Sequence, residues 1–176
     1  MLKKNIFIVV LLLFWVRIQA QEDNSVFQFL KIPFSSHAAA LGGENISIIE
    51  DDLTMAVHNP ALLSCVADKT LNLNYMLYIA GVNAASAAFS RVAGERSTWA
   101  VTAQFVNYGT MKETTSENVI IGTFSAKDMA FSGIYSYDLS DYWSGGVKAN
   151  LIYSNYEKFS SFAIGVDLGL NYYHQN

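Results

Sequence analysis

The chain has 176 residues, of which 52% are hydrophobic and 14% aromatic, and its formal net charge is −4. This length fits one domain, but the apolar content is high for a soluble domain of this size. The acidic balance argues against nucleic acid as a partner. The single cysteine, Cys65, excludes an internal disulfide.

The first 20 residues have the three-part layout of a secretory signal peptide. Lys3 and Lys4 precede an unbroken apolar run over 6–16, and Ile18-Gln19-Ala20 follows it. A membrane-anchoring helix is the weaker alternative, because about eleven residues rise only about 16 Å against a hydrocarbon core of about 30 Å. We expect cleavage before Gln21, which would remove three of the 11 basic residues and leave a formal charge of −7.

The stretch 21–66 does not alternate, and it predicts a compact, partly helical N-terminal segment. The run "SSHAAALGG" predicts a short helix that ends at Gly42 and Gly43, the usual residues of a C-terminal cap. In "DDLTMAVHNPALLS", Asn59 can cap a helix whose first residue is Pro60. The residue before a proline disfavours helix, so a helix from Asp52 must stop near His58. We therefore expect two short helical pieces joined at Asn59.

From residue 67 onward, apolar and polar residues alternate with the period of two that a β-strand imposes. Five segments have assignable faces, with Ile134 as an exception, and they lie at 71–79, 98–105, 129–137, 143–154 and 162–172. A sixth, 83–92, contains too much alanine for its faces to be assigned. Lengths of about ten residues match tilted strands that cross a bilayer and exceed the usual five or six residues of soluble strands.

Charges avoid the apolar face of the assignable segments, where a Lys or Arg at mid-bilayer costs roughly 2 to 4 kcal/mol. Lys148 and Asp167 lie mid-strand on the polar face. A tight hairpin centred near Glu157 would place these two residues opposite each other. We hypothesise that they form an ion pair inside a barrel lumen.

The connections between segments are short at one end, over 92–97 and 139–142. Outer-membrane barrels have short inner turns and longer outer loops, so we expect a long outer loop over Tyr108–Lys127 and short outer connections over 81–83 and 155–159. Aromatic residues at strand ends are typical of interfacial girdles, although they are also common in strands generally. These residues are Trp99, Tyr137, Tyr142, Trp143, Tyr153 and Tyr172.

Several stretches together resemble the PorV/PorQ family of type IX secretion, a branch of the FadL-like outer-membrane barrels. They are "FQFLKIPFSSHAAALGG", "DDLTMAVHNPALLS", "NYMLYIAG", "FVNYGTM", "GTFSAKDMAFSGIYSYDL" and "GGVKANLIYS…SFAIGVDLGLNYY". The opening stretch is most similar to the PorQ branch. The resemblance implies a barrel of about fourteen strands with an N-terminal plug in or under its lumen. Asn59, Pro60 and Ala61 match the family's motif, and Ala40, Gly42 and Gly43 match an earlier one.

The expected fold is therefore an all-β, antiparallel outer-membrane β-barrel, with a signal peptide at 1–20, a partly helical plug segment at 21–66 and barrel strands at 67–176. The chain supplies about six of the fourteen strands, which are too few to close a barrel. We expect it to be the N-terminal part of a longer protein, or to assemble from several copies.

No sequence motif for catalysis, phosphate binding or metal binding is present. His37, His58 and His174 are scattered, and the acidic run Glu50-Asp51-Asp52 is better explained as a solvated turn or helix start than as a cation site. We therefore expect no enzyme activity, cofactor or metal.

The family resemblance implies a non-enzymatic component of type IX secretion that helps to anchor or assemble the cell-surface cargo attachment machinery. Its expected partners are outer-membrane lipid and other proteins of that system, bound chiefly through the outer loop at Tyr108–Lys127. One alternative is a FadL-like transporter of hydrophobic small molecules. Another is a secreted, soluble β-sandwich that binds glycans.

Overall fold

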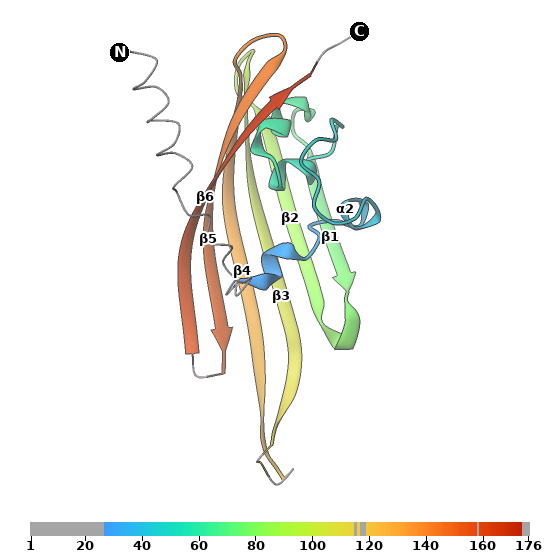
Figure 1. The fold of residues 1–176 in the computed structure, drawn as a ribbon, viewed down its shortest axis with the longest axis vertical. Helices are drawn as coiled ribbons and strands as arrows, with labels where there is room; N and C mark the ends of the chain where they lie inside the picture. The colour runs from blue at the N-terminus through green and yellow to red at the C-terminus, as the bar shows by residue number, and fades with distance from the viewer. Residues whose placement is uncertain (1–26, 115, 117–118, 158, 174–176) are drawn as a thin grey trace, which may run out of the picture.

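The computed structural model describes residues 27–114, 116, 119–157 and 159–173, so the predicted signal peptide and His174 lie outside the described residues. Six antiparallel strands form one sheet in the order of the sequence (Figure 1). They are β1 (Leu71–Leu77), β2 (Asn83–Val92), β3 (Ser97–Thr114), β4 (Ile120–Asp138), β5 (Trp143–Tyr156) and β6 (Phe159–Tyr172). The predicted all-β, antiparallel architecture is confirmed. The sheet is not closed, because β1 and β6 lie at its two edges.

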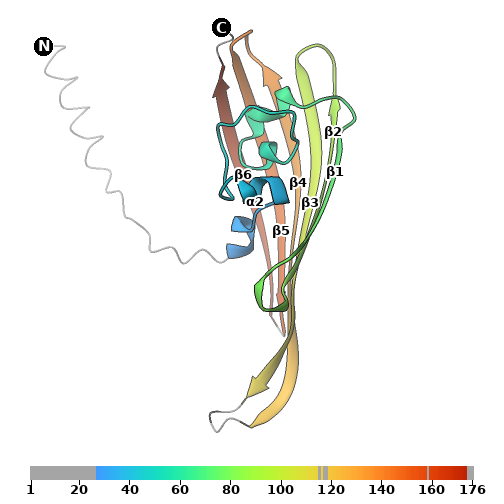
Figure 2. The ribbon, with the colours of Figure 1, turned by 90° about the vertical axis from the view of Figure 1, so that its right-hand side faces the viewer.

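The N-terminal segment, Phe27–Val66, lies against one face of this sheet (Figure 2). It contains η1 (Gln28–Lys31), α2 (Ser36–Ala40), η2 (Met55–Val57) and η3 (Pro60–Cys65), and a further short 3-10 turn, η4 (Ile79–Gly81), connects β1 to β2. The predicted helical pieces on both sides of Asn59 are present as 3-10 turns. The first of them ends at Val57, close to the expected limit at His58.

The sheet has two chemically different faces. The face beneath the N-terminal segment carries small and polar side chains, including Thr102, Ser136 and Asn150, which are buried. The opposite face carries the large apolar side chains, and these are exposed even on inner strands: Val101 is 51%, Phe131 57% and Leu151 49% accessible. The usual soluble arrangement is therefore reversed, with the polar face covered and the apolar face open.

The structure resolves two points that the sequence left open. In β2, the alanine-rich strand, Ala84, Ser86, Ala88 and Ser90 are buried on the covered face. Ile134, the exception to the alternation in β4, is also buried there. It belongs to a core cluster with Leu53 and Leu63 of the N-terminal segment, so this apolar side chain on the polar face packs beneath the covering segment.

The predicted long loop at Tyr108–Lys127 is wrong. β3 continues to Thr114 and β4 begins at Ile120, and their pairing extends as far as Thr114 and Ile120 after a register shift that follows Asn107. The polar composition of this stretch and its Gly109 are typical of a loop. Its Thr and Ile residues nevertheless favour extended structure, and the β3–β4 ladder provides hydrogen-bond partners for their backbone groups. The resulting hairpin reaches beyond the neighbouring hairpins (Figures 1 and 2).

The short connections agree with the prediction, since β2 ends at Val92, β3 starts at Ser97, β4 ends at Asp138 and β5 starts at Trp143. None of the helices in the described part of the chain has the length and hydropathy needed to cross a membrane.

Candidate functional site

The Asn-Pro-Ala motif is where the N-terminal segment meets β5 and β6. Asn59 has an extended backbone, and its Oδ1 accepts a hydrogen bond from the Ala61 amide at 3.1 Å, which caps η3 as the sequence predicts. Its Nδ2 donates to the Ile46 carbonyl at 2.8 Å. One buried side chain therefore starts the turn and ties it to the preceding loop, while Pro60 occupies the first turn, where a missing N–H costs nothing.

Two glycines form the surface that receives this motif. Gly146 of β5 and Gly169 of β6 are direct register partners. A Cβ on Gly146 would collide with the backbone of Pro60 and Ala61, and a Cβ on Gly169 would collide with Asn59 Oδ1 and lie 2.8 Å from Pro60 Cδ. The backbone of the motif therefore rests directly on the backbone of the sheet, at a distance that no other residue type permits.

Two serine hydroxyls hold the motif from the sheet side. Ser144 Oγ of β5 donates to the Ala61 carbonyl at 3.0 Å. Ser136 Oγ of β4 lies 3.4 Å from the same oxygen and donates to the nearer Gly145 carbonyl at 3.2 Å. Both serines are fully buried. The carbonyl of Ala61 is thus the centre of a polar contact between the N-terminal segment and two strands.

Lys148 and Asp167 lie next to this contact. The register of β5 and β6 places them directly opposite each other, with Nζ 3.3 Å from Asp167 Oδ2. Lys148 also donates to the Val57 carbonyl at 2.8 Å, so the ammonium group joins the two strands to the N-terminal segment. Asp167 accepts a further bond from Asn150 Nδ2 at 2.8 Å, and Ser132 Oγ donates to Asn150 Oδ1 at 2.6 Å. These side chains form a continuous polar network across β4, β5 and β6.

The earlier motif has a conformational role at the end of α2. Ala40 is its last residue, and Gly42 and Gly43 follow with φ of 102° and 100°. The Gly43 amide donates to the Ala38 carbonyl at 2.8 Å. Positive φ values of this kind favour glycine, so these residues end the helix.

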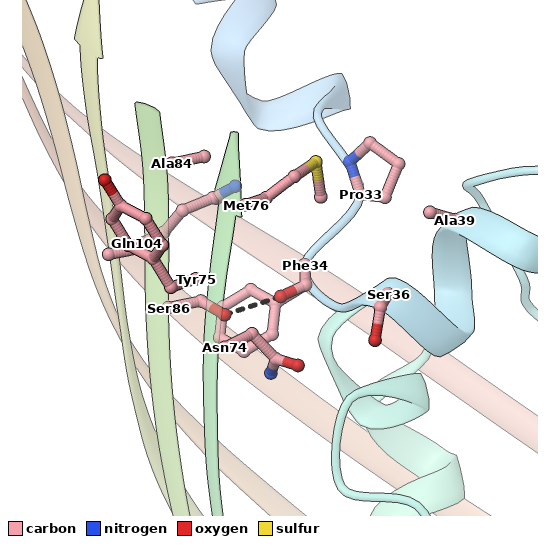
Figure 3. A pocket seen from close by; sticks show the side chains of 11 residues that line it. Pro33, Phe34, Ser36, Ala39, Asn74, Tyr75, Met76, Ala84, Ser86 and Gln104 are labelled. Atoms are coloured by element: carbon pink, nitrogen blue, oxygen red, sulfur yellow. Dashed lines mark hydrogen bonds between the residues drawn. The ribbon is translucent and has the colours of Figure 1, made fainter. Parts of the chain in front are cut away.

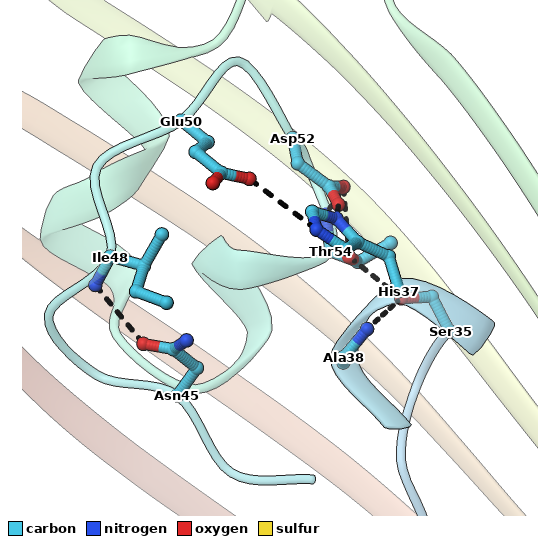
Figure 4. Close-up of polar contacts among 8 residues, drawn as sticks. All are labelled: Ser35, His37, Ala38, Asn45, Ile48, Glu50, Asp52 and Thr54. Atoms are coloured by element: carbon cyan, nitrogen blue, oxygen red, sulfur yellow. Dashed lines mark hydrogen bonds and ion pairs between the residues drawn. The ribbon is translucent and has the colours of Figure 1, made fainter. Parts of the chain in front are cut away.

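A histidine with two carboxylates fastens α2 to the following loop (Figure 4). His37 Nδ1 is 2.6 Å from Asp52 Oδ2, and its Nε2 is 3.5 Å from Glu50 Oε2. The hydrogen bond to Asp52 and the negative charge of both carboxylates raise the pKa of His37. Partial burial favours the neutral form of Asp52, but its bonds to His37 and Thr54 outweigh burial and lower the pKa of this carboxyl.

The acidic run at 50–52 is accounted for by contacts within the protein. Asp51 Oδ1 accepts from the Ala67 amide at 2.7 Å, and Asp52 Oδ1 accepts from the Thr54 amide and hydroxyl at 2.8 Å. Within the described residues, no group of three or more His, Cys, Asp or Glu is arranged to hold a metal ion.

Two hollows separate the N-terminal segment from the sheet. The smaller, about 200 Å³, lies between α2 and the β1–β2 hairpin, where Ser86 Oγ donates to the Phe34 carbonyl at 2.5 Å (Figure 3). The larger, about 380 Å³, has both apolar and charged lining, and its charged or titratable side chains are Glu44, His58, Lys148 and Asp167.

Sequence reasoning found Asn59, Pro60 and Ala61 but missed the glycines beneath them. The pair Gly145-Gly146 and the isolated Gly169 were visible as glycines inside strands, where glycine often marks a close approach of another backbone. It also missed the pairing of His37 with Asp52, which depends on a loop that brings together positions 15 residues apart.

No protein-family model matches the chain, and no curated protein matches it either.

Proposed function

We propose that the six strands form part of the wall of an outer-membrane β-barrel and that the N-terminal segment is its plug. The observation that carries this proposal is the reversed polarity of the sheet, whose large apolar side chains face away from the rest of the described chain. Soluble monomers rarely expose contiguous apolar patches beyond a few hundred Å². Lipid acyl chains are an environment in which such a face is stable.

The dimensions of the apolar face support this placement. At the end of the sheet that contains the β3–β4 and β5–β6 hairpins, the apolar face stops at a row of polar residues. These residues are successive register partners across β2 to β6: Asn83, Asn107, Lys127, Asn155 and Ser160. Along β5 the apolar face extends from Trp143 to Tyr153, about 34 Å at the usual rise per residue. At the strand tilt of about 35–45° found in membrane barrels, this length corresponds to a height of about 24–28 Å, close to the apolar band of about 25 Å in such proteins.

A soluble β-sandwich predicts a different environment for the same side chains, because its two sheets bury their apolar faces against each other. The described residues form one sheet, and the only described segment that packs on it covers the polar face. This arrangement favours the barrel wall over the sandwich.

Within that class, we propose a non-enzymatic role in type IX secretion, close to the PorQ branch, in which the protein helps to anchor or assemble the cargo attachment machinery. The resemblance of the plug and strand sequences supports this role, and the long β3–β4 hairpin offers a surface for partner proteins beyond the polar row. A transporter of hydrophobic molecules needs a continuous apolar path, whereas the larger hollow contains Lys148, Asp167 and Glu44. That lining counts against a continuous apolar path.

Two experiments test the proposal separately. For membrane placement, cells that express the full-length protein are fractionated, and we expect it in the outer-membrane fraction, with extraction requiring detergent. Recovery as a soluble monomer would refute the barrel wall.

For the secretion role, the full-length gene is deleted and cargo display at the cell surface is measured. We expect display to be lost or strongly reduced, and to be restored by a plasmid-borne copy. Normal display would refute the secretion role and leave the membrane placement intact.

A further inference from the structure

His58 lies between the two points at which the N-terminal segment is fastened to β5 and β6. On one side of it, the Val57 carbonyl accepts a hydrogen bond from Lys148 at 2.8 Å. On the other side, Asn59 begins the motif that rests on Gly146 and Gly169. His58 is therefore the immediate sequence neighbour of a residue in each attachment.

The Nε2 nitrogen of His58 has no acceptor for a proton. This nitrogen is buried and makes no hydrogen bond in the structure. A neutral imidazole tolerates this position at modest cost, because a ring nitrogen without a hydrogen needs no acceptor. An imidazolium would place an N–H and a positive charge there without a partner, and burying such a group is expensive.

Charged groups reach the same hollow from three elements. Lys148 comes from β5, Asp167 from β6, and Glu44 from the loop after α2. Asp167 is already engaged by Lys148 and Asn150. Lys148 is the cation that disfavours protonation of His58, and Glu44 is the anion that partly offsets it.

We propose that His58 and Lys148 make this attachment acid-sensitive, so that protonation of His58 releases the Asn-Pro-Ala motif from β5 and β6. Two neighbouring cations would then compete for the limited negative charge of the hollow, and the Lys148–Val57 hydrogen bond is the contact most directly exposed to that repulsion.

The direction of the pH dependence follows from the environment of His58. Burial, and then the charge of Lys148, lower the pKa of His58 from its ordinary value of 6.5, against the opposing effect of Glu44. The attached state therefore binds fewer protons than the released state in the interval between the two pKa values. Its stability is complete above about pH 6.5, falls as the pH drops from there toward the lowered pKa of His58, and levels off below that pKa.

Hydrogen exchange of the full chain in detergent provides the test. Protection factors for the backbone amides of η2 and η3 are measured between pH 7.5 and 5.0, after correction for the intrinsic exchange rate at each pH. We expect protection to fall on acidification by at most about tenfold per pH unit, the limit for one proton. We expect His58→Gln, which cannot be protonated in this range, to abolish the fall.

His37→Gln is the matched control, because it removes the other described histidine, and we expect the acid-induced loss of protection to persist. An NMR titration adds a readout that does not depend on the stability of the variants. The pKa of His58 is expected below 6.5 in the wild type and higher in Lys148→Met. The proposal is overturned if protection in the wild type does not fall with acid, if His58→Gln shows the same fall, or if His58 titrates at or above its ordinary value.

Discussion

Gly146→Ala is the sharpest test of how the N-terminal segment is held. The added Cβ would collide with the backbone of Pro60 and Ala61, neither of which can rotate away as a flexible side chain could. Overpacking of this kind costs roughly 1–3 kcal/mol. Displacement of Ala61 would also lose the hydrogen bond that Ser144 donates to its carbonyl, at about 0.5–1.5 kcal/mol. We therefore expect the attachment of the segment to weaken by about 1.5–4.5 kcal/mol.

Limited proteolysis measures this effect, because a released segment is cleaved faster while the paired strands remain protected. We expect cleavage within the N-terminal segment to accelerate strongly in Gly146→Ala. Two matched controls are available in the same sheet. Gly165 of β6 lies on the covered face, and a Cβ there would make only ordinary contacts with Asn150. At Gly133 of β4, a Cβ would meet nothing within 4 Å.

Both control substitutions are expected to behave like the wild type. If Gly146→Ala is cleaved no faster than Gly165→Ala, the backbone contact does not hold the segment, and our account of the Asn-Pro-Ala motif fails.

Three further outcomes are expected. Asn59→Ala removes the cap of η3, which lowers the stability by about 0.5–2 kcal/mol, and it leaves the Ile46 carbonyl without its hydrogen bond. The urea midpoint of unfolding is therefore expected to fall, and an unchanged midpoint would contradict the role of the cap. His37→Gln is most destabilising between about pH 3.8 and 6.5, where His37 and Asp52 are both charged. Its effect on the urea midpoint fades as the pH rises through the raised pKa of His37 or falls through the lowered pKa of Asp52. A pH-independent effect would rule out the charged pair. Leu151→Arg, on the exposed apolar face, weakens folding into lipid vesicles by roughly 2–4 kcal/mol, and wild-type insertion would argue against contact with lipid.

Much of the fold could be predicted because the relevant signals are local. Alternation along each strand depends on the direction of successive side chains, which the backbone imposes without reference to distant residues. The helix stop before Pro60 and the cap at Asn59 likewise depend on neighbouring atoms alone. The opposition of Lys148 and Asp167 needed only the length of one hairpin.

The long-range features were less accessible. We expected a loop over 108–127 because outer-membrane barrels alternate short inner turns with longer outer loops. Pairing between β3 and β4 instead extends both strands through this stretch. The faces of β2 were ambiguous because alanine fits either side, and the covering segment decides which alanines are buried.

By itself, the sequence determined a β-rich chain with one apolar and one polar face per strand, preceded by short helical turns. Tertiary structure alone decided that the turns cover the polar face and that Asn59, Pro60 and Ala61 rest on Gly146 and Gly169. The physical reason is that periodicity specifies only the direction of each side chain. A close approach of two backbones depends on atoms separated by more than 80 residues. In the sequence, such an approach is marked only by a glycine, which has no side chain.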